Sequence, residues 1–278
     1  MQAPNVRYLV FDLESIADAP LVSKLRYAGQ SLEPAEALRR YRAELMERYE
    51  SDFIPYTFQV PVAAAVGKVT EDFRLLDVVL LDEPNFRPHV IAENFWRGWE
   101  RYHRPTLVSF NGRGFDLPLL ELAAFRYGLS LPGWFAGSGK SYDQPRNRYN
   151  VQAHIDLCEL LTNFGATRFQ GGLNLAANLL GKPGKMNVQG DMVQDFFDAG
   201  RLREINEYCR CDVLDTYFVF LRTRVMLGQL ELDAEQQIIA ETKQWLGEKA
   251  AQVEGFRTYL EHWGDWQNPW GGADGMTR

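Results

Sequence analysis

The chain has 278 residues, which is long enough for one large domain or for a domain of ordinary size with an appendage. Its residues are 46% hydrophobic and 13% aromatic, which is typical of a globular core and excludes a largely disordered chain. The formal net charge of −7 argues against a protein that binds long duplex DNA through a basic surface, but it leaves open an enzyme that grips a short end of a strand.

The first part of the chain is predicted to alternate strands with a helical insertion. Residues 6–13 form a buried strand in which apolar residues run directly into two acids. A charged helix follows over residues 34–50, with Pro34 in its first turn. Because this helix interrupts the path to the next strand, we interpret it as an insertion. Residues 59–69 and 73–81 then form a predicted hairpin.

The remaining elements predict the fold class. A helix over residues 88–102 leads to a short strand over 106–110 and to a helix over 116–128 that ends in a glycine cap. Residues 131–150 are loop-like, and residues 151–157 return to a strand. Helices alone follow, over residues 173–180, 191–198, 201–223 and 232–248. This order predicts an α/β fold in which three strands form an antiparallel meander, two parallel strands add through crossovers, and helices flank the sheet.

Three segments carry acids where a ligand site could form. Asp12 and Glu14 are two residues apart on an extended segment, so they face the same side at the carboxyl end of the expected central strand. Asp116 begins a helix, where an aspartate can also serve as an ordinary cap. Tyr208 and Asp212 are four residues apart and share one face of a helix. An aspartate in such an apolar helix costs free energy unless it is compensated.

One other aspartate, Asp156, and the cysteines are interpreted as structural. Asp156 stands on the last predicted strand, and Asp215 points in a neighbouring direction on the helix of Asp212. Cys209 and Cys211 are two residues apart on a helix, so their side chains diverge by about 200° and do not form a zinc site. An odd number of cysteines implies no disulfide framework, which favours a reducing, cytoplasmic location. Neither a secretory signal nor a run that could cross a membrane is recognised.

The segments "FDLES", "NGRGFD" and "YCRCD" together resemble the three exonuclease motifs of the DEDD superfamily of 3′–5′ exonucleases, in its tyrosine variant. More closely, they resemble the proofreading exonuclease domain of family-B DNA polymerases and the stand-alone bacterial proteins predicted to be related to it. The resemblance covers residues 7–222, and residues 171–185 look like the link before the last motif. The histidine variant is excluded because its position is Glu207. Ser15 departs from the threonine of many relatives.

The resemblance implies a ribonuclease H-like fold with a mixed five-stranded sheet. Residues 1–225 would form the exonuclease domain, including the inserted helix at about 34–50, whose role the resemblance does not explain. Residues 226–278 would form a helical extension with a Trp-rich tail that packs on this domain. We expect the tail tryptophans to cover the core or a sheet edge, with a docking surface for a partner as the alternative; they are Trp263, Trp266 and Trp270.

The resemblance also implies a catalytic set and its cofactors. Hydrolysis of a phosphodiester places negative charge on the attacking and leaving oxygens, and two hard divalent ions, Mg²⁺ or Mn²⁺, can neutralise both. Asp12 would bridge the two ions. The hydroxyl of Tyr208 would orient the attacking water, because a phenol is too weak a base at neutral pH. The metal ligands would be Asp12, Glu14, Asp116 and Asp212, and with Tyr208 they form the predicted catalytic set.

Substrate binding is predicted at two places. One group lies beside the acids in sequence and could pack against the terminal nucleotide. The other lies in the loop 138–150, where cations alternate with Tyr142 and Tyr149, an arrangement suited to phosphates and unpaired bases. An ordinary solvated loop is the alternative. The predicted substrate-binding residues are Leu13, Asn111, Phe115, Lys140, Arg146 and Arg148.

Three functions are compatible with these motifs. The preferred hypothesis is a metal-dependent 3′–5′ exonuclease that hydrolyses single-stranded DNA from its 3′ end. The second keeps the chemistry but trims RNA, since few side chains near the ribose sense the 2′-OH. The third is a non-catalytic module that binds nucleic acid or protein, which the loss of any one acid would favour. All four acids are present in the chain.

Overall fold

A five-stranded mixed sheet forms the centre of the computed structural model, which describes residues 5–137, 139–186 and 192–270. The strands lie in the order β3-β2-β1-β4-β5. β1 pairs antiparallel with β2 and parallel with β4, β2 pairs antiparallel with β3, and β4 pairs parallel with β5. The predicted meander with two parallel additions is therefore confirmed. The strands are β1 (Tyr8–Ala17), β2 (Gln59–Val69), β3 (Leu75–Leu80), β4 (Thr106–Ser109) and β5 (His154–Asp156).

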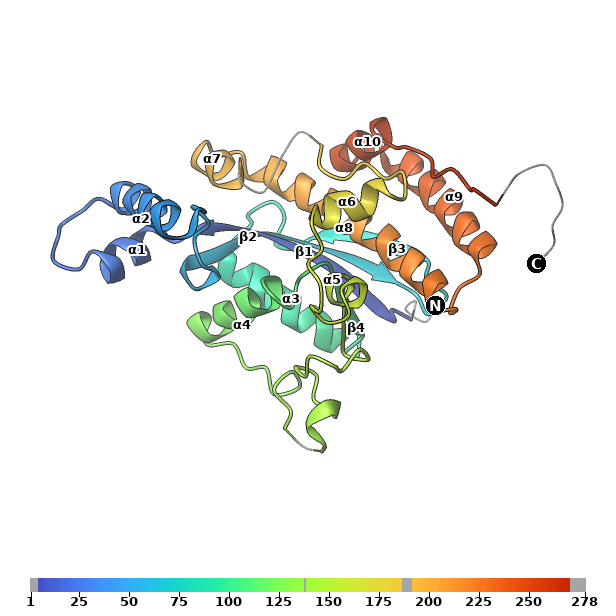
Figure 1. Cartoon of the computed structure of the whole chain (residues 1–278), viewed down its shortest axis with the longest axis horizontal. Helices are drawn as coiled ribbons and strands as arrows, with labels where there is room; N and C mark the ends of the chain where they lie inside the picture. The colour runs from blue at the N-terminus through green and yellow to red at the C-terminus, as the bar shows by residue number, and fades with distance from the viewer. Residues whose placement is uncertain (1–4, 138, 187–191, 271–278) are drawn as a thin grey trace.

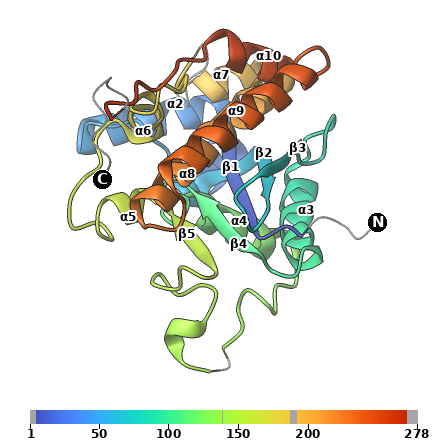
Figure 2. The same cartoon turned by 90° about the vertical axis from the view of Figure 1, so that its right-hand side faces the viewer.

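Helices cover both faces of this sheet (Figures 1 and 2). α3 and α4 lie against one face, and α8 lies along the other, where it contacts β1 and β2. The α-helices are α1 (Ala19–Arg26), α2 (Pro34–Tyr49), α3 (Pro88–Arg101), α4 (Asp116–Tyr127), α5 (Leu157–Leu161), α6 (Gly172–Asn178), α7 (Val193–Asp198), α8 (Leu202–Met226), α9 (Leu232–Lys249) and α10 (Glu254–Glu261), with short 3₁₀ turns at Tyr56–Phe58 and Ser141–Asp143.

Most predicted elements are confirmed, and the last strand is the clearest difference. β5 ends at Asp156 because the carboxylate of this residue accepts hydrogen bonds from the backbone N–H groups of Cys158 and Glu159, at 3.0 and 3.3 Å, and so caps α5. The helices α1, α5 and α10 were not predicted. Residue 191 of one predicted helix, residue 138 of the predicted loop and residues 271–278 of the predicted tail lie outside the described residues.

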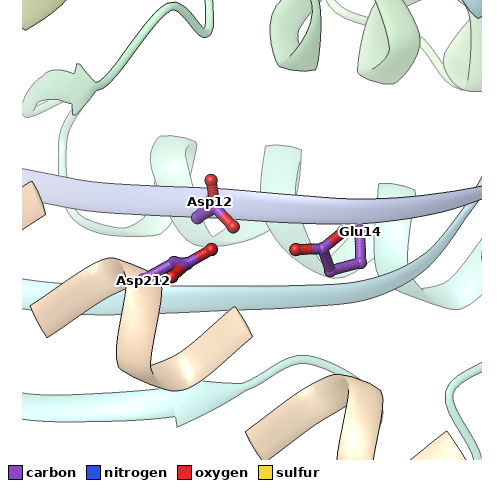
Figure 3. Close-up of side chains that lie close together, drawn as sticks. All are labelled: Asp12, Glu14 and Asp212. Atoms are coloured by element: carbon purple, nitrogen blue, oxygen red, sulfur yellow. The ribbon is translucent and has the colours of Figure 1, made fainter. Parts of the chain in front are cut away.

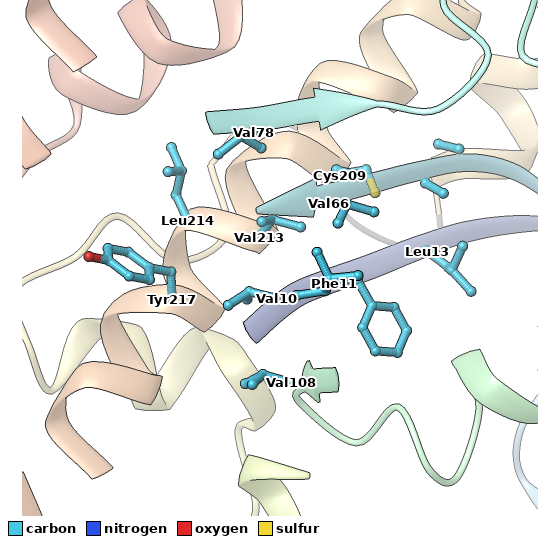
Figure 4. Packing of buried hydrophobic residues seen from close by; sticks show 14 of the residues in the cluster. Val10, Phe11, Leu13, Val66, Val78, Val108, Cys209, Val213, Leu214 and Tyr217 are labelled. Atoms are coloured by element: carbon cyan, nitrogen blue, oxygen red, sulfur yellow. The ribbon is translucent and has the colours of Figure 1, made fainter. Parts of the chain in front are cut away.

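The two faces of β1 are distinguished by alternate side chains. Phe11 packs on Phe95 of α3, with ring centroids 4.9 Å apart. Val10 points to the opposite face, where Gly67 of β2 leaves room for Val213 of α8: a Cβ at position 67 would lie 3.2 Å from Val213 Cγ1 (Figure 4). Because alternate residues of a strand share a face, the side chains two and four positions after Val10 also point toward α8.

A two-helix insertion (residues 18–55) projects beyond the sheet at the left of Figure 1. Asp18 caps α1 by accepting a hydrogen bond from the N–H of Leu21 at 3.1 Å, and Arg126 of α4 binds the same carboxylate at 2.5 Å. The insertion therefore has a fixed attachment to the body of the molecule. A small hydrophobic core joins Ala17 at the end of β1 to seven residues of the insertion, which are Val22, Tyr27, Ala37, Leu38, Tyr41, Leu45 and Ile54.

The C-terminal helices α9 and α10 contribute to the same hydrophobic cluster as the sheet, through residues such as Leu246 and Phe256. The ring centroid of Trp263 lies 5.3 Å from that of Phe218 on α8, so this tryptophan covers the core as predicted. Trp270 is 68% exposed. The division of the chain near residue 225 stays a prediction. No helix in the described part of the chain is long and apolar enough to cross a membrane.

Candidate active site

Asp12 and Glu14 lie on the face of β1 that points toward α8. Both are opposite small alanines of β2. The register of this pair shifts after Glu14, so that Ser15 pairs with Pro61 and β2 contains one extra residue, Val62. A β-bulge bends a strand and re-aims the side chains next to it, and bulges are frequent beside active sites. The bulge lies directly beside the second acid of the pair.

Asp212 reaches the same space from α8. Figure 3 shows its carboxylate directed toward those of Asp12 and Glu14. Each of the three residues offers one carboxylate oxygen, and these oxygens all lie within 4.8 Å of one another. Among the residues that the structure describes, this is the single group of three or more His, Cys, Asp or Glu side chains close enough to hold a metal ion. Residues separated by 200 positions in the chain thus converge.

Asp116, at the start of α4, is the fourth acid and is buried. The turn before it is held by Asp156, whose two carboxylate oxygens accept the backbone N–H groups of Asn111 and Arg113, each at 2.9 Å. Asn111 adopts a left-handed conformation with φ 63°, which asparagine tolerates better than most residues. The structural role predicted for Asp156 agrees with these contacts. Its carboxylate fixes the turn that delivers Asp116.

The four acids (Asp12, Glu14, Asp116 and Asp212) repel one another in a poorly solvated space. Burial raises the pKa of Asp12 and of Glu14 well above the usual range, and the charges of neighbouring acids raise both further. Burial likewise raises the pKa of Asp116 and of Asp212 to about 7. Closely spaced carboxylates are stable as anions when a cation compensates them, and hard divalent ions prefer oxygen ligands. The donor set therefore fits such an ion.

Two neighbours on α8 contact these acids. The hydroxyl of Tyr208 acts as a hydrogen-bond donor that lowers the pKa of Asp212, while burial and the charge of Asp212 raise the pKa of Tyr208 itself. The phenol therefore stays neutral. The thiol of Cys209 donates to the backbone oxygen of Asp12 at 3.3 Å and lies 3.7 Å from its carboxylate. Cys209 and Cys211 are both buried, as predicted.

The acids open into a cleft of about 720 Å³. One wall is formed by the start of α4, a second by the insertion, and a third by Lys185 and α7. The charge of Lys185 lowers the pKa of Glu14 and of Asp212. Sequence reasoning did not identify Lys185, although it ends the segment "GKPGK" in the link before the last motif. It also missed the contribution of the insertion, whose cleft-lining residues include Arg42, Asp52, Phe53 and Ile54.

The predicted substrate-binding residues divide into two groups. Leu13, Asn111 and Phe115 line the cleft. The three cations of the 131–150 loop do not: Arg146 binds Glu121 through two contacts of 2.8 and 2.7 Å. Arg148 contacts Glu159 at 2.8 Å, and Lys140 is exposed. The structure thus brings the first group to the acids and leaves Lys140, Arg146 and Arg148 outside the cleft.

Residues 51–266 match the sequence profile of a protein family described as "Predicted 3'-5' exonuclease related to the exonuclease domain of PolB". The matched range begins just after α2. It contains three members of the predicted catalytic set, Asp116, Tyr208 and Asp212, whereas Asp12 and Glu14 precede it. No curated protein is similar enough to this chain to count as a match.

The fold is shared with a solved structure, the family B DNA polymerase from the hyperthermophilic archaeon Pyrobaculum calidifontis. The match covers 90% of this chain but 30% of the polymerase chain, with a TM-score of 0.50 and 16% sequence identity. This chain therefore corresponds to a part of the larger protein. The likeness establishes the architecture alone, and it confirms the ribonuclease H-like fold that the motifs implied.

Proposed function

Because the chain belongs to the family of predicted 3′–5′ exonucleases related to the exonuclease domain of PolB, which are hydrolases, we propose that it removes nucleotides from the 3′ end of single-stranded DNA. The observation that carries this proposal is the convergence of the carboxylates of Asp12, Glu14 and Asp212 within 4.8 Å, beside an open cleft that Asp12 and Glu14 line. The relation to a DNA polymerase supports DNA over RNA as the substrate.

The four acids would hold two divalent cations, Mg²⁺ or Mn²⁺, and when bound these ions would neutralise the charge that develops on the attacking and leaving oxygens. The raised pKa values support this role, because they reflect the burial and mutual repulsion of the carboxylates, which a bound cation would compensate as it displaces their protons. The charges of the other three acids all act on Asp12 and raise its pKa. This arrangement supports its predicted bridging role.

The neighbouring side chains would position the reactants. The neutral hydroxyl of Tyr208 would orient the attacking water, since a phenol whose pKa is raised cannot serve as a base near neutral pH. The positive charge of Lys185 would lie beside the scissile phosphate and offset the negative charge of the acids. Leu13 of β1, together with Asn111 and Phe115 from the segment that precedes α4, would contact the terminal nucleotide.

The roles predicted for Lys140, Arg146 and Arg148 stay predictions, and their positions outside the cleft give them little support. The cytoplasmic location is likewise a prediction that rests on the cysteines. A non-catalytic binding module is disfavoured because the chain keeps all four acids and the tyrosine, and because the carboxylates of Asp12, Glu14 and Asp212 lie within 4.8 Å of one another.

The test offers single-stranded DNA, single-stranded RNA of the same sequence and duplex DNA, each labelled at the 5′ end, with Mn²⁺, with Mg²⁺ and with EDTA. We expect a ladder that shortens from the 3′ end, fastest on single-stranded DNA and absent with EDTA. Asp212→Asn should abolish the ladder, whereas Asp233→Asn, which removes an exposed charge at the start of α9, should not. An active Asp212→Asn variant would refute the assignment, and faster loss of RNA would reassign the substrate.

A further inference from the structure

The insertion is more than an appendage, because it forms one wall of the cleft. Phe53, in the segment between α2 and the first 3₁₀ turn, lines the cleft together with Phe115 of the opposite wall. Their ring centroids are 5.7 Å apart and the ring planes are inclined by 56°. Phe53 is nevertheless 59% exposed. A large apolar ring is thus held at the mouth of an acidic cleft with much of its surface facing solvent.

An exposed ring in this position suits an unpaired base. Stacking of a base on an aromatic side chain is tolerant of sequence, because every base has a π-face, and proteins that bind single strands rely on it. Phe115 comes from the segment that begins α4, beside Asp116, whereas Phe53 comes from the insertion. The two rings can therefore hold the end of a strand within the cleft that Asp12, Glu14 and Asp116 also line.

Arg42 of α2 supplies a cation on the same wall. Its Nε is enclosed by protein atoms and has no hydrogen-bond partner among the described residues. Its Nη1 lies 3.7 Å from a carboxylate oxygen of Asp52, whose side chain is 55% exposed. Such a long, solvated ion pair contributes little and can be exchanged for a stronger partner. A guanidinium has donors arranged for the oxygens of a phosphate.

We propose that the insertion is the substrate-binding wall of this enzyme: Phe53 and Phe115 stack the unpaired bases at the 3′ end, and Arg42 binds a backbone phosphate. This inference rests on the proposed nuclease function and names the residues that select its substrate. A base must leave a duplex before its face can lie on Phe53. The wall therefore favours unpaired ends of any sequence over paired ones.

The stacking role is tested by binding. The probe is a 12-nucleotide single-stranded DNA with a 5′ fluorophore, titrated with protein in the inactive Asp212→Asn background so that it stays intact. Phe53→Ala should raise the Kd by about 5- to 150-fold, the range expected for one stacked base. Phe53→Trp should restore tight binding. Tyr49→Ala, which removes an exposed ring at the end of α2, is the matched control and should change the Kd less than twofold.

A probe without bases makes the test specific. If the ring stacks a base near the 3′ end, a DNA with abasic residues at its last two 3′ positions should bind weakly to the Asp212→Asn protein, and adding Phe53→Ala should weaken it no further. Equal losses on the normal and the abasic probe would show that Phe53 supports the fold of the wall and does not stack a base, which would overturn the proposal. A comparison of melting temperatures then identifies a folding defect.

The phosphate role of Arg42 has its own readout. One phosphate contact on a single strand contributes about 0.7 to the slope of log Kd against log salt concentration. Arg42→Gln should reduce this slope by that amount, while Arg39→Gln, an exposed arginine of the same helix, should leave it unchanged. An unaltered slope in Arg42→Gln would overturn this part.

Different results would contradict the nuclease function and the assignment of the insertion as the substrate-binding wall. If the unmodified enzyme releases no nucleotides from any probe, the nuclease function is wrong. If the unmodified enzyme is active and Phe53→Ala has the same KM and Kd as Tyr49→Ala, the nuclease function stands and the assignment of the wall is wrong.

Discussion

At the scale of single residues, burial and mutual repulsion of the acids disfavour their charged forms. The acids themselves can nevertheless be recognised in the sequence. Asp12, Glu14 and Asp212 could be identified from the sequence because each lies in a short motif on an element that the residue pattern also predicts. Lys185 could not, since a lysine in a glycine-rich link has no distinctive spacing. Its place beside the acids depends on how Gly184 and Lys185 lie against Tyr208, Asp212 and Asp215 of α8, which sequence periodicity does not encode.

Removing one acid should separate catalysis from stability. Asp12→Asn is expected to lower kcat by at least about 10³-fold, because the charge stabilisation supplied by a bound cation amounts to several kcal/mol. The same change should raise the melting temperature in EDTA, because burial and three neighbouring charges disfavour the carboxylate at this position. Nuclease assays and thermal melts in EDTA measure the two effects. A lower melting temperature in EDTA would contradict the account of repulsion.

Lys185→Ala should alter the pH dependence of activity. Its positive charge lowers the pKa of Glu14 and Asp212, so its removal lets both acids keep their protons to higher pH. Protons compete with the divalent cation for these acids. The pH at which kcat/KM reaches half its maximum should therefore rise, and Lys185→Arg should restore it. A pH–rate profile between pH 5.5 and 9 checks this, and an unchanged midpoint would exclude an electrostatic role.

At the scale of elements, long periodic segments were predictable and short capped ones were not. α2, α3, α4, α8 and α9 follow the predicted ranges closely, because each has a clear start signal or a long apolar face. β5 was predicted over residues 151–157 but spans His154–Asp156, because residues 151–153 form turns held by the backbone oxygen of Asn150 and because the side chain of Asp156 starts a helix at the other end. α10 was missed because the partner that explains its burial, Asp215 of α8, is far away in sequence.

The contact between α8 and α10 gives a test at this scale. The hydroxyl of Tyr259 donates to a carboxylate oxygen of the fully buried Asp215 at 2.6 Å. Tyr259→Phe should leave that oxygen without this partner and reduce the free energy of unfolding by about 1–3 kcal/mol. Tyr142→Phe, whose ring is 54% exposed, is the control and should change stability by less than about 0.5 kcal/mol. Denaturant unfolding measures both. Equal stabilities would show that Asp215 is compensated by other groups.

The 131–150 loop gives a second test. Arg146 binds Glu121 of α4 through two contacts, and Trp134 donates to the same carboxylate at 2.7 Å. We expect Arg146→Ala to lower stability by about 0.5–1 kcal/mol, the range for a well-formed surface pair, and to leave KM within twofold. A several-fold rise in KM for single-stranded DNA, with unchanged stability, would instead establish the substrate-binding role predicted from the sequence.

At the scale of the whole molecule, the sheet order and the layers of helices were predictable, whereas the shape of the cleft was not. The order of strands and crossovers restricts an α/β chain to few topologies, and the motifs indicated which strand is central. The insertion appeared in the sequence as a single charged helix. The structure shows two helices that carry Arg42 and lead into Phe53 at the cleft, and this depends on contacts such as that of Asp18 with Arg126.

The metal-free protein should lose stability as the pH rises. Asp116 and Asp212 have pKa values of about 7 in the folded state against a usual value of 3.8. Between these values the folded state binds more protons than the unfolded state, so the free energy of unfolding falls with increasing pH and the contribution is lost above about pH 7. The melting temperature in EDTA should therefore be lower at pH 8 than at pH 6.

Added Mn²⁺ should remove this dependence, because a cation takes the place of the protons, and Asp212→Asn should weaken it. Thermal melts at both pH values, with EDTA and with Mn²⁺, measure all four conditions. A melting temperature in EDTA that rises between pH 6 and pH 8 would show that other titrating groups dominate.

The separate core of the insertion has a consequence for how the enzyme can change. Seven buried residues of the insertion form, with Ala17 at the end of β1, a cluster apart from the main hydrophobic cluster that supports β1 and α8. Substitutions within this small core are therefore expected to disturb the main core less than substitutions made in the main core itself. A laboratory library confined to residues 18–55 can search for new strand preferences while the machinery that cuts remains intact.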